Sequence, residues 1–152
     1  MDMMIQVVGA FLAIYAFAAA LDAPKRYLPY CGLTGAMGWL VYLLAEPGRG
    51  VVMANFLGAT AISLGSHILA RIFKAPVTVF LIPAIMILVP GADLYRTVYH
   101  FMIGNQSLSA GYLTRTIQIA GMIAVAIFIT DSLFSAFWRH ITAKKITKDQ
   151  EK

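Results

Sequence analysis

The chain has 152 residues, of which 60% are hydrophobic and only 12% are charged. Soluble domains carry about 25% charged residues, so this composition excludes an ordinary soluble domain. The net charge of +5 comes from basic residues between or after apolar runs, which membrane topology explains better than nucleic-acid binding. We therefore expect a membrane domain over residues 1–138 and a basic cytoplasmic tail over residues 139–152.

Apolar runs predict an all-α, polytopic integral membrane protein that lies in the lipid bilayer. The five predicted transmembrane segments are residues 3–21, 28–45, 51–73, 77–89 and 116–138. All but the fourth reach or approach the roughly 20 residues that a spanning helix needs. The first positive charges follow the first run, at Lys25 and Arg26, the reverse of a secretory signal. We expect the first segment to be a retained helix.

The fourth segment is the unusual one, because it is short and interrupted by proline. Residues 77–89 make a helix of roughly 20 Å, preceded by Pro76, broken at Pro83 and ended by Pro90 and Gly91. Broken backbone at membrane depth survives only inside protein or beside a water-filled cavity. Short, proline-interrupted segments are typical of transporter binding sites. We expect a substrate pathway here, with Pro83, Pro90 and Gly91 in it.

Basic residues predict the orientation and suggest a partner. Nine of the twelve lysine and arginine residues fall on one side of the predicted membrane, and the other three are Arg49, Arg96 and Arg115. The positive-inside rule then places the N-terminus outside and the C-terminus in the cytoplasm. A carrier made of two inverted repeats needs two halves. Five crossings therefore indicate one half, with a partner supplying the other.

Small and polar residues form two patterns in the second and third segments. Spacings of four residues between small side chains predict close helix packing at Gly32, Gly35 and Gly38, and we add Gly58 to this group. In the third segment, one narrow stripe carries a set of small and polar residues: Asn55, Ala59, Ser63, Ser66 and Ala70. The polar members either hydrogen-bond between helices or form the wall of a transport pathway.

Two carboxylates lie in or near the apolar segments, and intramembrane carboxylates are functional by default. Asp93 can cap the helix after Pro90, sit at the outer interface, carry a coupling proton or contact substrate. Asp131 either pairs with a basic residue such as Arg139 or relays protons. Tyr95 is an interfacial anchor or a pathway residue, and Arg96 and His100 face the same way.

Signals for catalysis are poor. The three histidines, His67, His100 and His140, are scattered without metal-ligand spacing, and no glycine-rich phosphate loop is present. We expect no enzyme activity, no cofactor and no metal. We interpret His67 as a structural residue that forms a hydrogen bond within the helix bundle.

Several runs of sequence resemble the bacterial threonine/serine exporter family, and most closely the small subunit of its split form. These runs are KAPVTVFLIP at residues 74–83, LVPG at 88–91, LYRTVY at 94–99, CGLTGAMGWLVY at 31–42 and ANFLG at 54–58. The resemblance implies a multi-pass subunit in the bacterial inner membrane. It implies proton-driven export of threonine, serine or a related small carboxylate, together with a larger membrane subunit. The alternative is a non-transporting scaffold that stabilises a larger membrane protein, and a higher-order oligomer is a further option.

Overall fold

The computed structural model describes the backbone of residues 2–150 and the side chains of residues 2–136. The regular elements in this part of the chain are all helices, as the apolar runs predict. Short 3-10 turns precede α2 (η1, Lys25–Tyr27) and follow α3 (η2, Met86–Leu88). The five α-helices are α1 (Met3–Ala20), α2 (Leu28–Phe73), α3 (Thr78–Ile85), α4 (Gly91–Met102) and α5 (Gln106–Gln150).

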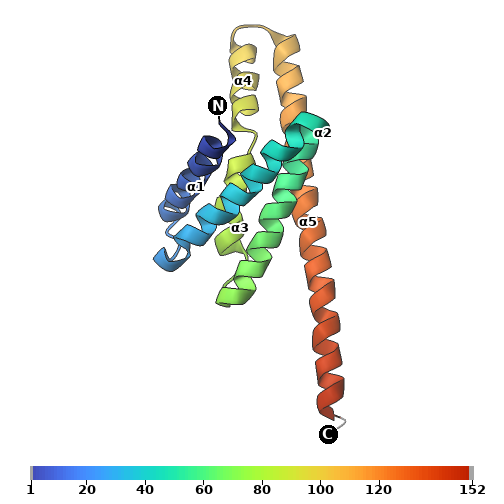
Figure 1. Ribbon diagram of the computed structural model, residues 1–152. Coiled ribbons are helices and arrows are strands. Elements are labelled where there is room, and N and C mark those ends of the chain that lie inside the picture. The colour runs from blue at the N-terminus through green and yellow to red at the C-terminus, as the bar shows by residue number, and fades with distance from the viewer. Residues whose placement is uncertain (1, 151–152) are drawn as a thin grey trace.

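The second and third predicted segments form the two halves of α2, which are separated by a sharp kink at Gly50. We expected a loop over residues 46–50, but the helix continues through Pro47 and is interrupted only at Gly50. Gly50 has φ 77° and ψ 164°, a backbone conformation that side-chain-bearing residues rarely adopt. The two halves, residues 28–49 and 51–73, consequently lie side by side (Figure 1).

Glycines allow the closest helix contacts of the bundle. Gly38 and Gly58 face each other across the two halves of α2, so that the Gly38 carbonyl oxygen lies 3.0 Å from the Cβ position of Gly58. Gly32 and Gly35 lie against Phe11 and Ile14 of α1. All four glycines predicted to pack therefore lie at helix contacts.

The fourth predicted segment is broken where Pro90 and Gly91 predict it. Helix α3 and η2 end at Leu88, and α4 starts at Gly91 with a bend of 47° between the two parts. Proline has no backbone N–H to continue a helix, and Pro90 takes the N-cap position of α4. Residues 92–101, whose apolar positions have helical spacing, are part of this new helix.

Helix α5 begins ten residues before the predicted start of the fifth segment. The Asn105 side chain accepts a hydrogen bond from the Leu108 backbone N–H at 3.3 Å, which caps the helix start. The Ser109 hydroxyl donates to the Thr97 carbonyl at 2.8 Å and ties α5 to α4. Residues 106–115 contain too many polar side chains to be recognised as part of an apolar run. Their contact with α4 stabilises them as helix. The resulting α4–α5 hairpin extends past the bend of α2 (Figure 1).

Length and composition make several of these helices candidates for crossing a membrane. Within the described residues three stretches qualify, namely Met3–Ala20, Lys25–Phe73 and Gln106–Ala136. A fourth is added if α3, η2 and α4 are taken as one bent span. The chain is thus an all-helical protein with several long apolar helices.

A cysteine stabilises the backbone beside Pro83, the proline inside α3. Pro83 lacks the N–H that would bond the carbonyl of Val79 four residues earlier, and the Cys31 thiol lies 3.4 Å from that oxygen, which accepts its hydrogen bond. Cys31→Ser keeps a donor, whereas Cys31→Val removes it. We expect the valine variant to lose about 1 kcal/mol of stability relative to serine, measured by thermal unfolding in detergent. Equal melting temperatures would contradict this role.

Candidate functional site

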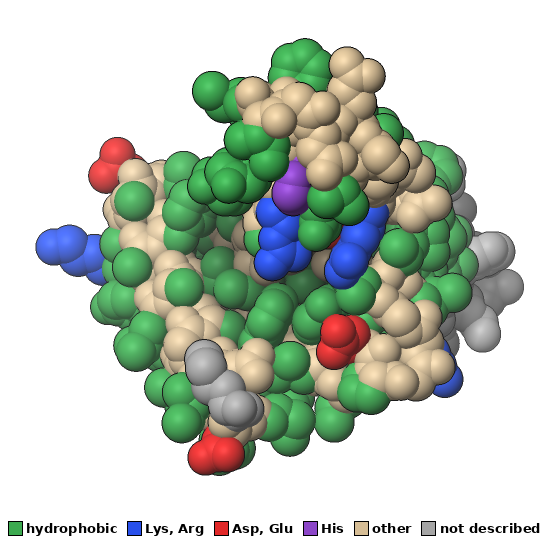
Figure 2. All heavy atoms as spheres, turned by 90° about the horizontal axis from the view of Figure 1, so that it is seen from above, with side chains coloured by type: hydrophobic (Ala, Val, Ile, Leu, Met, Phe, Trp, Pro, Cys, Tyr) green, Lys and Arg blue, Asp and Glu red, His purple; other side chains and the backbone are tan. Residues whose placement is uncertain are grey.

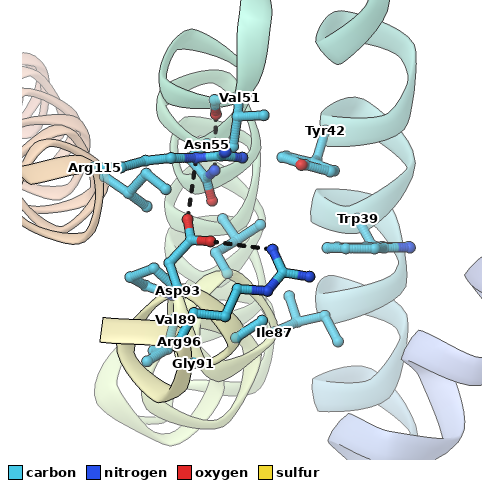
Figure 3. Close-up of a pocket in the computed structure, with 14 residues that line it drawn as sticks. Trp39, Tyr42, Val51, Asn55, Ile87, Val89, Gly91, Asp93, Arg96 and Arg115 are labelled. Carbon is cyan, nitrogen blue, oxygen red and sulfur yellow. Dashed lines mark hydrogen bonds and ion pairs between the residues drawn. The ribbon is translucent and has the colours of Figure 1, made fainter. Parts of the chain in front are cut away.

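A cavity of about 330 Å³ lies at the break between η2 and α4. Its walls come from both halves of α2, from residues 87–93 and from α5, so segments far apart in sequence meet there (Figure 3). Seen from the end where the α4–α5 hairpin stands, basic side chains and a histidine gather around a hollow with a hydrophobic floor (Figure 2). This volume is in the range of small-molecule sites.

Asp93 is the central charged residue of this cavity. It occupies the first turn of α4 and is only 6% exposed. Its carboxylate lies 3.0 Å from Nε of Arg115 on α5 and 3.7 Å from Nη1 of Arg96 one turn along α4 (Figure 3). Two guanidinium groups thus face one carboxylate, which leaves the cavity with a net positive charge.

The two arginines differ in how firmly they are held. Arg115 makes the shorter contact with Asp93, which fits a fixed ion pair. Arg96 makes the longer contact, its side chain is about half exposed, and its Cζ lies 5.6 Å from the ring centre of Tyr112. His100 stacks on the same tyrosine ring. Arg96 and His100 therefore share one polar and aromatic patch, as their spacing predicts.

The remaining walls combine an amide with aromatic surface. Asn55 lines the cavity, and its amide nitrogen donates to the Val51 carbonyl at 2.8 Å. Trp39 and Tyr42 stack with ring centres 4.8 Å apart on the opposite wall. Such a cavity offers charge on one side and an apolar surface on the other, which suits a small charged solute.

Four of the predicted pathway residues meet at this cavity: Asn55, Pro90, Gly91 and Asp93. Ser63 and Ser66 lie deeper on the same face of α2, fully buried, and neither hydroxyl has a hydrogen-bond partner among the described residues. Pro83 lines a separate cavity near Asp22. Tyr95 is 69% exposed and stacks on Tyr99, away from the cavity.

The structure shows the surroundings of the two carboxylates, Asp93 and Asp131. Asp93 is buried in the wall of the cavity, and it makes no side-chain cap bond to α4. Asp131 lies 3.4 Å from the buried His67 on α2. The side chain of Arg139, the partner suggested by sequence, lies outside the described residues.

Sequence reasoning missed Arg115, Trp39 and Tyr42 as cavity residues. From the sequence, Arg115 served only to predict the orientation in the membrane, because it directly precedes the apolar run of α5. Its position beside Asp93 depends on how the α4–α5 hairpin closes, and no local pattern reports that. Trp39 and Tyr42 lie within an ordinary apolar segment.

Long apolar helices, one of them broken beside a charged cavity, are typical of the class of membrane transporters. The sequence pattern of one family, described as "Threonine/Serine exporter, ThrE", matches residues 6–133. The chain therefore belongs to the threonine/serine exporter family, which confirms the resemblance found in the sequence. The family is described by amino-acid export and not by a catalysed reaction.

One curated relative is a "Threonine/serine exporter" of Corynebacterium glutamicum, 27% identical over 123 residues. The match covers 78% of this chain and 25% of the relative, so the chain spans about a quarter of that protein's length. No solved structure matches the chain.

Proposed function

We propose that this chain is one subunit of a secondary transporter that exports threonine, serine or a related small carboxylate. Substrate binds in the cavity at the Pro90–Gly91 break. The observation that carries the proposal is Asp93, a buried carboxylate held between Arg115 and Arg96 at 3.0 and 3.7 Å. Family membership supports the amino-acid class of substrate.

The charges of the cavity match those of a zwitterionic amino acid. A guanidinium group binds a carboxylate in two parallel hydrogen bonds, and Arg96, the looser of the two arginines, is the one available for this contact. Asp93 is placed to receive the substrate ammonium group. Asn55 and the unpaired N–H groups at the start of α4 lie beside them for a side-chain hydroxyl or a carboxylate oxygen.

A polar face of α2 continues from the cavity into the bundle. Asn55 lies at the cavity, and the buried hydroxyls of Ser63 and Ser66 follow along the same stripe without partners among the described residues. Buried hydroxyl groups usually find a hydrogen-bond partner. Their orphan state supports a pathway that is closed in this conformation and becomes lined by these residues when it opens.

The helix topology supports a half-transporter that works with a larger partner in the bacterial inner membrane. Counting the two halves of α2 separately, and α3 with α4 as one span, we infer five crossings. The basic residues then place the N-terminus outside, the C-terminus in the cytoplasm and the cavity at the outer end. A larger membrane subunit supplies the remaining part, and proton movement through Asp93 or Asp131 drives export.

The test is an efflux assay with radiolabelled threonine, serine and succinate in cells that express this chain with its larger subunit. We expect efflux of threonine or serine only when both subunits are present. Full efflux from the partner alone would establish the scaffold alternative. Particle size in mild detergent reports the assembly, and a closed oligomer of this chain alone that transports would overturn the two-subunit proposal.

A further inference from the structure

A second pair of ionisable side chains lies on α2 and α5, well away from the cavity. His67 and Asp131 bring Nε2 and Oδ1 to 3.4 Å. His67 is three turns beyond Asn55 on the second half of α2, towards the end of the bundle where Arg71 and Lys74 lie. Neither residue lines the cavity at the Pro90–Gly91 break.

The two partners differ in their access to the surroundings. His67 is only 5% exposed, and its ring stacks on Phe134 with centres 4.7 Å apart. The Asp131 side chain is 65% exposed. The pair therefore joins a buried imidazole to a carboxylate on the surface of the bundle.

Among the described side chains, two charged groups act on His67. Asp131 faces it from α5, and Arg71 lies one turn along α2, with its guanidinium over the Phe134 ring at 5.3 Å. The α3 helix contains no ionisable residue. One turn before His67, the Ser63 hydroxyl is buried and has no hydrogen-bond partner within the described residues.

Stability alone gives little reason for this pair. An ion pair with one exposed member contributes little to folding. Placing an ionisable residue in an apolar span is costly, and such residues characteristically mark proton relays and ion pathways. Imidazole also gains and loses its proton near neutral pH, unlike any other unperturbed side chain.

We propose that His67 and Asp131 form a proton-binding site separate from the substrate cavity. A proton binds the carboxylate of Asp131 and passes to Nε2 of the neutral His67, which leaves an imidazolium beside a carboxylate. Release reverses these two steps. The inference rests on the proposed transport function and assigns the coupling proton to this pair.

The test separates exchange from proton-driven transport in proteoliposomes that hold the exporter with its larger subunit. Exchange of labelled for unlabelled threonine needs no net proton movement, whereas accumulation driven by an imposed pH gradient does. We expect His67→Gln and Asp131→Asn to retain exchange within about twofold and to lose accumulation by about tenfold or more. Asp22→Asn removes a carboxylate from the end of α1 and keeps both activities.

Three outcomes decide the proposal. Wild-type accumulation by His67→Gln overturns it. A wild-type protein with neither exchange nor accumulation overturns the proposed transport function instead. If the variants fail to fold, histidine NMR of the wild-type protein replaces them: an imidazole of His67 that does not titrate between about pH 5 and about pH 9 overturns the proton site.

Discussion

The variant Asp93→Asn should still reach the membrane, and its export should fall by at least about tenfold. The amide is nearly the same size as the carboxylate but carries no charge, so the two guanidinium groups lose the anion between them. Both arginine side chains are about half exposed, so solvent screens these ion pairs and the loss of folding stability should stay below about 1 kcal/mol. The substrate ammonium group also loses its counterion. Labelled threonine efflux, normalised to membrane protein by immunoblot, measures the effect.

Three further variants separate binding from folding in this prediction. Glu46→Gln removes an exposed carboxylate at the same end of the molecule, outside the cavity, and should export normally. Arg96→Gln should raise the substrate concentration for half-maximal efflux, because Arg96 is the looser partner of Asp93. Combining Asp93→Asn with Arg115→Gln removes both charges of the tighter pair, so protein stability should recover while export stays low. Wild-type efflux by Asp93→Asn would contradict the role of Asp93.

Local chemistry made the broken helix predictable. Pro90 cannot continue a helix and Gly91 adapts to the new direction, so the break follows from two adjacent residues. The packing glycines were predictable for a similar reason, because spacings of four residues place small side chains on one helix face. Polar residues of the third segment were predicted on one stripe, and the structure buries Asn55, Ser63 and Ser66 together.

Contacts between distant segments set the limit of prediction. Arg115 is 22 residues from Asp93, and only the closure of the α4–α5 hairpin brings their side chains to 3.0 Å. His67 and Asp131 are farther apart still and meet because α5 returns along α2. The break between the second and third segments was predicted at residues 46–50, but its restriction to Gly50 was not, since Pro47 and Gly48 together resemble a loop. Each of these features depends on tertiary packing, which the local pattern does not contain.

Alanine at position 38 should markedly destabilise the fold. A Cβ atom there would lie 2.2 Å from Cγ1 and 2.4 Å from Cδ1 of Ile62, and 3.3 Å from the Gly58 carbonyl oxygen. Ile62 is completely buried, so its side chain has no free space to move into. Overpacking of this kind costs about 1–3 kcal/mol. Thermal unfolding in detergent measures the loss, and separation of the α2 halves should also disturb Trp39 and Asn55 in the cavity.

A matched glycine gives the opposite expectation. At Gly121 of α5 a Cβ atom would meet nothing within 4 Å, so Gly121→Ala should stabilise the helix by up to about 1 kcal/mol through its higher helix propensity. Ile62→Ala combined with Gly38→Ala removes both clashing atoms, so the double variant should be more stable than the two single losses added together. If Gly38→Ala unfolded at the same melting temperature as Gly121→Ala, this result would contradict the close approach of the α2 halves. Because Trp39 follows Gly38 directly, the same close approach sets the width of the cavity beside Asp93.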